Sequence, residues 1–209
     1  MHALDYDFVV STIQLPKEAR ILDFGCADGS FLSLFARNYT DLYGIEINQE
    51  MANEARKRNI QIISAIDQSL QFDLIILRGV LQHIPNQHDL LDKAIKSTAA
   101  RKGTVAILQT PNSDSYLFRK FNRLPAVEEE LDFSSLYLIP SASSLNHYFT
   151  RRSLTTTIQY PYFKTPYARP LIDFIRVLIS RIFSSYRKTP LPKNMFNLIA
   201  FHPGNSVKN

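Results

Sequence analysis

Short apolar runs alternate with amphipathic stretches along the first half of the chain. The runs that we predict to be strands are 20–24, 42–47, 60–65, 72–77 and 104–109. Apolar residues at helical spacing predict helices between them, over 30–38, 49–58 and 88–99. Strands that alternate with helices form a parallel sheet with both faces covered, because each crossover helix packs on the sheet. The pattern therefore predicts an α/β fold.

The alternation of predicted strands and helices ends after the fifth strand. Residues 111–149 are rich in aromatic residues and prolines, and long connections of this kind usually form lids or binding loops. We therefore expect a substrate-facing insertion at 111–149. The stretch "FTRRSLTTTI" that follows predicts a helix with Thr150 as its N-cap. The run 195–201, "MFNLIAF", predicts the last strand.

Residues 170–190 predict an amphipathic, basic helix. Its apolar positions are Leu171, Phe174, Ile175, Leu178 and Ile182. This face could pack on the domain or in a homodimer, and it could also lie on an anionic membrane surface. The pattern alone leaves these alternatives open.

The composition indicates one globular domain over residues 1–209. The chain has 45% hydrophobic and 21% charged residues, and Cys26 is its only cysteine, so an internal disulfide is excluded. The first ten residues have no basic stretch, and no apolar run reaches the ~18 residues that span a bilayer. We expect a cytoplasmic protein, with peripheral membrane contact as the variant.

The net charge of +5 is unevenly distributed. Residues 1–150 hold 14 Lys and Arg against 18 Asp and Glu, whereas residues 151–209 hold 10 Lys and Arg against Asp173 alone. A basic segment of this kind favours an anionic partner, such as a phosphorylated substrate, a lipid headgroup or nucleic acid. A solvated basic face without a partner explains the charge equally well.

Small residues form a turn between the first predicted strand and helix, in "LDFGCADGSF". Gly25, Ala27 and Gly29 alternate, and Asp23 precedes them. A turn of small residues before a helix lets a ligand approach the main chain and favours an anion at the amides. The dinucleotide pattern G-x-G-x-x-G is excluded, because Ser30 stands where its third glycine belongs.

The turn instead resembles motif I of the class I S-adenosylmethionine-dependent methyltransferases, D/E-x-G-x-G-x-G. Further motifs of that family follow in the expected order. Glu46 ends "LYGIE", "FDLIILRGVLQHIPN" resembles the family's fourth strand and exit loop, and "GTVAILQTPN" resembles its fifth strand. The stretch "NHYFTRRSL" resembles a segment of the subgroup that methylates quinones, sugars and other small molecules.

The resemblance implies a Rossmann-like, doubly wound sheet of seven strands in the order 3-2-1-4-5-7-6, with strand 7 antiparallel. It also implies S-adenosylmethionine as the cofactor. No cluster of His, Asp and Cys residues has the spacing of metal ligands, so we expect no metal. The implied cofactor-binding residues are Asp23, Gly25, Cys26, Ala27, Gly29, Glu46, Ile47, Ala65, Ile66, Asp67, Arg78 and Gln82. Among them, Glu46 would bind both ribose hydroxyls, Asp67 would approach the adenine, and the amides of the turn would face the cofactor's carboxylate.

Two positions depart from the family pattern. Ala27 replaces a glycine, which a chain tolerates if φ at this residue is negative. Arg78 stands where the family commonly has a small or polar residue, and it could pair with the cofactor's carboxylate or turn outward. The alanine also needs its methyl group to point away from the cofactor, and both orientations of Arg78 stay open.

The resemblance predicts methyl transfer to a small-molecule acceptor by in-line displacement, with oxygen favoured as the methylated atom and an anionic or lipophilic acceptor. His147 is the best candidate for a catalytic base. Two alternatives remain: an RNA or protein methyltransferase that uses the basic C-terminal region, and a non-catalytic module that binds S-adenosylmethionine. The basic segment lacks interleaved aromatic residues, so we expect no dedicated nucleic-acid module.

Overall fold

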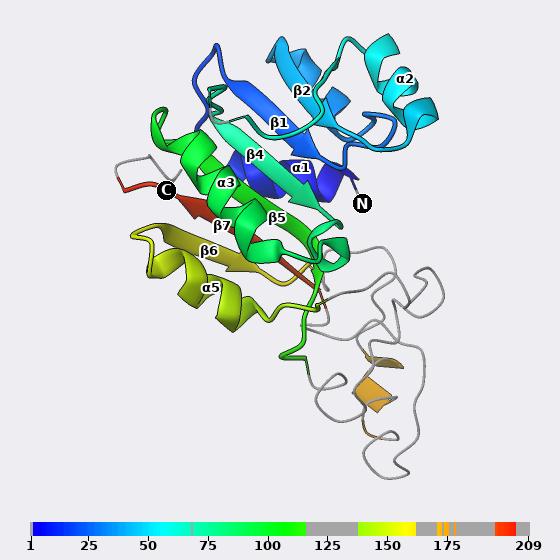
Figure 1. Cartoon of the computed structure of the whole chain (residues 1–209). Coiled ribbons are helices and arrows are strands. Elements are labelled where there is room, and N and C mark those ends of the chain that lie inside the picture. Colours follow the sequence, from blue (N-terminus) through cyan, green and yellow to red (C-terminus); the bar gives the residue numbers. More distant parts are fainter. Residues whose placement is uncertain are drawn as a thin grey trace.

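The computed structural model of the chain describes residues 2–67, 69–115, 138–161, 171–172, 174–175, 178 and 195–203. Seven strands form one sheet in the order β3-β2-β1-β4-β5-β7-β6 (Figure 1). They are β1 (Arg20–Phe24), β2 (Asp41–Ile45), β3 (Gln61–Ile62), β4 (Leu74–Arg78), β5 (Thr104–Pro111), β6 (Thr155–Gln159) and β7 (Met195–Phe201). Strands β1 to β5 are parallel, and β7 is antiparallel to β5 and β6. The expected fold class and strand order are confirmed.

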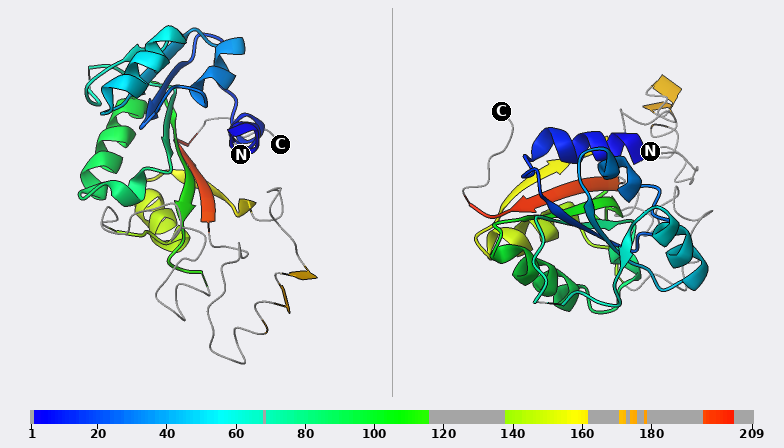
Figure 2. Two further views of the ribbon diagram at one scale, coloured as in Figure 1. Left: turned by 90° about the vertical axis from the view of Figure 1, so that its right-hand side faces the viewer. Right: turned by 90° about the horizontal axis from the view of Figure 1, so that it is seen from above.

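Helices cover both faces of the sheet. Figure 2 shows α1 on one face and α3 and α5 on the other. The helices are α1 (His2–Thr12), α2 (Gln49–Lys57), α3 (Gln87–Ala99) and α5 (Ala142–Thr150), with the short 3₁₀ helices η1 (Leu32–Arg37) and η2 (Leu81–His83). Side-chain caps fix three starts: Asn48 caps α2, Asn86 caps α3, and Ser141 forms a capping box with Ser144 at α5.

The apolar residues form one core on each face of the sheet. Phe8 of α1, Phe35 of η1 and Ile76 of β4 belong to the first core. Leu91 of α3 and Phe149 of α5 belong to the second. Residues 74–77 of β4 are all apolar and alternate between the two cores, which explains why this central strand was predictable from its apolar residues.

Three local predictions need correction, and one helix was not predicted. The helix expected over 30–38 is the 3₁₀ helix η1, and the strand expected over 60–65 keeps only the two residues of β3. The helix expected after Thr150 is wrong: Thr150 ends α5, and β6 follows as an edge strand that pairs with β7. Helix α1 was not predicted; its buried face mixes the apolar Phe8 and Val9 with the polar Asp5 and Thr12.

Two expected segments are only partly described. Of the insertion expected at 111–149, the structure describes only the two ends. Residues 111–115 continue the chain from the end of β5, and of residues 138–149, those from 142 onward lie in α5. Of the helix expected over 170–190, the described residues are helical and their apolar side chains are exposed, including Leu171 (73%) and Phe174 (65%). Within the described residues, no helix is long and apolar enough to cross a membrane.

Candidate cofactor site

The turn after β1 is fixed by the neighbouring strand. The backbone N–H groups of Gly25 and Cys26 both donate to the carbonyl oxygen of Ile45, at 2.8 and 3.1 Å. Gly25 and Gly29 have φ values of +78° and +77°, a left-handed region that L-residues rarely adopt. A side chain at Gly29 would also come within 2.3 Å of Ile60 Cδ1. These positions therefore require glycine for the backbone geometry and for packing.

Ala27 adopts φ +49°, so the alanine is not accommodated by a negative φ. The turn stays left-handed here although the residue is alanine, and its methyl group is exposed, which makes the conformation tolerable. The N–H of Ala27 donates to Oε2 of Glu46 at 3.0 Å. The alanine is thus accommodated by space around its side chain, at a cost in backbone strain.

Other amides of the turn are also engaged. The N–H of Gly29 donates to the carbonyl of Cys26 at 2.9 Å, and that of Ser30 donates to Oδ1 of Asp28 at 3.0 Å. Together with the bonds to Ile45 and Glu46, these contacts use most donors that were expected to face the cofactor's carboxylate. The turn is therefore a shaped support for a ligand more than an anion-binding nest.

Glu46 follows directly after β2, beside the turn. Its Oε1 accepts the N–H of Asn48 at 2.8 Å, and its Oε2 accepts the N–H of Ala27. Each carboxylate oxygen can accept a second hydrogen bond, so two vicinal hydroxyls could bind here. The next residue, Ile47, is 93% exposed and offers an apolar surface to a flat ring.

Asp23 lies at the base of the turn and is 2% exposed. Its Oδ1 has no hydrogen-bond partner among the described residues. Burial raises the pKa of Asp23 to about 7, the positive charge of Arg78 opposes this, and Glu46 adds to it. A buried carboxylate oxygen without a donor is costly unless a ligand supplies one, and an ammonium group would do so.

Cys26 is buried under the turn. Burial first, and the charges of Asp23 and Glu46 after it, raise the pKa of its thiol to about 12. The sulfur therefore stays protonated and packs against Gly44, where a side chain would come within 2.4 Å of it. Its part in the site is to support the turn.

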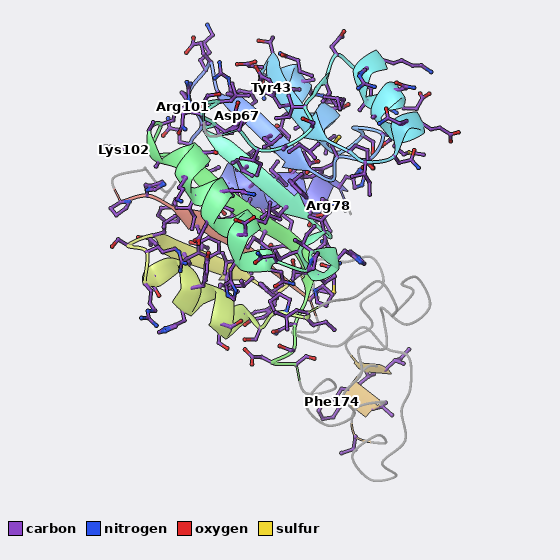
Figure 3. The ribbon with its side chains drawn as sticks, viewed as in Figure 1. Tyr43, Asp67, Arg78, Arg101, Lys102 and Phe174 are labelled. Carbon is purple, nitrogen blue, oxygen red and sulfur yellow. The ribbon has the colours of Figure 1, made fainter. Side chains whose placement is uncertain are left out.

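The end of β4 brings Arg78 and Gln82 to the same edge of the sheet. Arg78 donates from Nε to Oδ2 of Asp5 at 2.9 Å, and its guanidinium lies over the ring of Phe31 at 5.2 Å (Figure 3 labels Arg78). It is 22% exposed, so it does not turn outward. Gln82 is 3% exposed, and its Oε1 has no partner among the described residues.

Several predicted residues are not gathered at the turn. Ala65 and Asp67 are exposed in the loop after β3, with Ile66 half-buried between them, and Figure 3 shows Asp67 away from Arg78. The Asp67 carboxylate accepts the N–H of Ser69 at 2.9 Å. His147 is exposed on α5, in a surface hollow that it shares with His88, Ser144, Tyr148, Arg151 and Arg152. Adenine contacts from the loop and a base role for His147 stay predictions.

A buried polar cluster that was not predicted lies next to Arg78. Asp5 is 1% exposed, and it accepts hydrogen bonds from Arg78, from Gln109 Nε2 at 2.6 Å and from Asn197 Nδ2 at 3.4 Å. One signal was available: Asp5 shares a helical spacing with Phe8, which places a charge on an otherwise apolar face. Within the described ranges, no group of His, Cys, Asp or Glu side chains is arranged to hold a metal ion.

The strand order, the glycine turn after β1 and the acid after β2 define the fold of the S-adenosylmethionine-dependent methyltransferases. The chain matches the methyltransferase domain family over residues 6–159 and belongs to that family. The cofactor of this fold is S-adenosylmethionine, and the unpartnered Asp23 oxygen and the Glu46 carboxylate fit its ammonium and hydroxyl groups.

The chain is similar at low sequence identity to several methyltransferases. It is 26% identical over 129 residues to trans-aconitate 2-methyltransferase of Variovorax paradoxus, covering 57% of this chain and 49% of the relative. A methyltransferase structure from Archaeoglobus fulgidus superposes with a TM-score of 0.62 at 16% identity, covering 96% and 92% of the two chains. The plantazolicin methyltransferase BpumL, solved with S-adenosylhomocysteine (SAH), superposes with a TM-score of 0.58 at 17% identity, covering 96% and 82%. The chain spans about half the length of the curated relatives it matches.

Proposed function

We propose that the chain transfers a methyl group from S-adenosylmethionine to an oxygen atom of a small-molecule acceptor. The observation that carries the proposal is the Glu46 carboxylate, which is fixed beside the glycine turn by two backbone N–H groups and keeps capacity for two hydroxyls. Membership of the methyltransferase domain family supports the reaction class.

In this proposal, each residue of the site binds a different part of the cofactor. Glu46 binds the ribose hydroxyls, Ile47 contacts the adenine, and Asp23 accepts from the ammonium group. When bound, S-adenosylmethionine supplies an electrophilic methyl group on a sulfonium. The work of the protein is then to hold the acceptor in line with that group and to exclude water.

An acceptor with a carboxylate is the first to test. The relative from Variovorax is named for trans-aconitate, which is a small carboxylic acid. An ionised carboxylate attacks with its own lone pair and loses no proton, so such an acceptor needs no catalytic base. Phenolic or lipophilic acceptors stay within the proposal, with His147 as the candidate base for a hydroxyl.

The test is a methyl-transfer screen with radiolabelled S-adenosylmethionine. The acceptor pools are carboxylic acids including trans-aconitate, catechols, sugar nucleotides, lipids, bulk RNA and total protein. Label in a small-molecule pool supports the proposal, and Glu46→Gln should reduce it in parallel with SAH affinity. Label confined to RNA or protein overturns the small-molecule acceptor, and SAH binding without transfer to any pool overturns the enzyme in favour of a binding module.

A further inference from the structure

The cluster around Asp5 ties the first helix to the ends of three strands. Its carboxylate accepts from Arg78 of β4, Gln109 of β5 and Asn197 of β7, and it is 1% exposed. Gln109 has a φ of +53° at an irregularity between β5 and β7, and its N–H donates to Oδ1 of Asn197 at 2.8 Å. Strained residues and bulges that aim side chains at one point are typical of functional sites.

The guanidinium of Arg78 is held in one place but is only partly used. Its Nε donates to Asp5, and Phe31 supports one face of the group. In the described part of the chain, the two terminal nitrogens have no hydrogen-bond acceptor. A planar guanidinium with free terminal nitrogens binds a carboxylate through two parallel hydrogen bonds.

Strand register places Arg78 and Asp23 on the same face of the sheet. Asp23 of β1 pairs with Ile76 of β4, and paired residues project to the same side. Arg78 lies two residues beyond Ile76, so it projects to that side as well. The unpartnered oxygen of Asp23 and the available donors of Arg78 therefore lie at adjacent strand ends. An α-amino acid requires such a pair, an acceptor for its ammonium group and a donor for its carboxylate.

We propose that Arg78 binds the carboxylate of the cofactor's amino-acid end, next to Asp23, and that Asp5 is the positioning residue that fixes the Arg78 guanidinium. The engaged N–H groups of the turn leave this carboxylate without a backbone partner there, and Arg78 provides one. Helix α1 thereby becomes part of the cofactor site. The inference rests on the proposed use of S-adenosylmethionine but is independent of the acceptor.

The test is calorimetry with three ligands of the folded, full chain. SAH carries the whole amino-acid end, decarboxylated SAH lacks only the carboxylate, and 5′-methylthioadenosine lacks the amino-acid end. We expect the wild type to bind SAH about 10- to 100-fold more tightly than decarboxylated SAH, the usual size of a charge-assisted pair. Arg78→Gln should abolish this difference and leave the affinity for 5′-methylthioadenosine within about threefold.

Asp5→Asn separates positioning from general stability. It should lower the affinity for SAH by about 3- to 10-fold, since only the orientation of Arg78 changes. The affinity for 5′-methylthioadenosine should stay that of the wild type. The double variant Asp5→Asn with Arg78→Gln leaves no unpaired buried charge, so it keeps the measurement open if a single variant folds poorly. Arg101→Gln is the matched control, because this arginine pairs with Asp73 away from the site (Figure 3) and should change no affinity.

Three results would overturn the inference. SAH affinity that is unchanged in Arg78→Gln would assign the arginine to another ligand, such as the acceptor. An equal loss for SAH and 5′-methylthioadenosine would make the role of Arg78 structural. Wild-type protein that binds 5′-methylthioadenosine but does not prefer SAH would show that the amino-acid end has no site, whereas failure to bind either ligand would overturn the proposed function itself.

Discussion

The strained alanine of the turn gives the sharpest test of the local geometry. Ala27 holds φ +49°, and a left-handed conformation costs an L-residue about 1–2 kcal/mol. Glycine removes this strain but adds about 0.4–1 kcal/mol of conformational entropy to the unfolded chain. The free energy of unfolding of Ala27→Gly should therefore be unchanged or rise by up to about 1.5 kcal/mol.

Cofactor affinity should respond little to the same substitution. The contact of residue 27 with Glu46 runs through the backbone N–H, which glycine retains, and the methyl group that is lost is exposed. We expect the Kd for SAH to stay within about tenfold of the wild type, or ~1.4 kcal/mol. Urea unfolding with and without SAH, together with calorimetry, measures both quantities.

Ser153→Gly is the matched control. Ser153 also has a left-handed φ, +61°, and it is exposed between α5 and β6, outside the cofactor site. It should show a similar gain in stability with no change in SAH affinity. A loss of more than about 1 kcal/mol in Ala27→Gly, beside a gain in Ser153→Gly, would refute the reasoning, because the methyl group would then be packing against something.

Four further outcomes are expected. Glu46→Gln should lower the affinity for SAH by about 10- to 100-fold in calorimetry, because an NH₂ donor replaces one of the two acceptor oxygens. A change below about threefold would contradict the role of Glu46. Because burial raises the pKa of Asp23 from 3.8 to about 7, the folded protein holds a proton that the unfolded chain releases, so stability should fall as the pH rises between those values. Asp23→Asn should flatten this dependence in urea unfolding, and equal slopes would contradict it. Asp73→Asn should lower the unfolding free energy by about 2–3 kcal/mol, because its Oδ2 accepts from Arg101 and from a backbone N–H of β1, both at 2.8 Å. If residues 170–190 lie on membranes, the chain should sediment with anionic vesicles at low salt and be released at high salt; no sedimentation at low salt would indicate packing instead.

The parts of the fold that were predictable from the sequence are those whose local residue pattern is typical of a single type of element. Residues 74–77 of β4 are apolar and buried on both faces, which is the pattern of a central strand in a parallel sheet. Strand β7 has the same bounds as the apolar run that predicts it. Glu46 was predictable because the turn and the second strand fix its place along the chain.

Other elements depend on contacts that a linear pattern does not contain. The polar strand β6 is stabilised by pairing with β7, and its threonines alone did not distinguish a strand from a helix. The left-handed φ of Ala27 follows from the closure of the turn on Ile45 and Glu46. The buried position of Asp5 depends on donors from three strands, two of them more than 100 residues away in sequence.

The position of β7 also has a consequence for how the protein is made. β5 and β6 do not pair with each other; each pairs with β7, which emerges from the ribosome after both. Until residues 195–201 are available, one side of β5 exposes unpaired backbone groups, and the unit of α5 and β6 has no strand to join. Completion of the sheet therefore waits for a late, long-range pairing, and a nascent or truncated chain without β7 should aggregate through the open edge of β5.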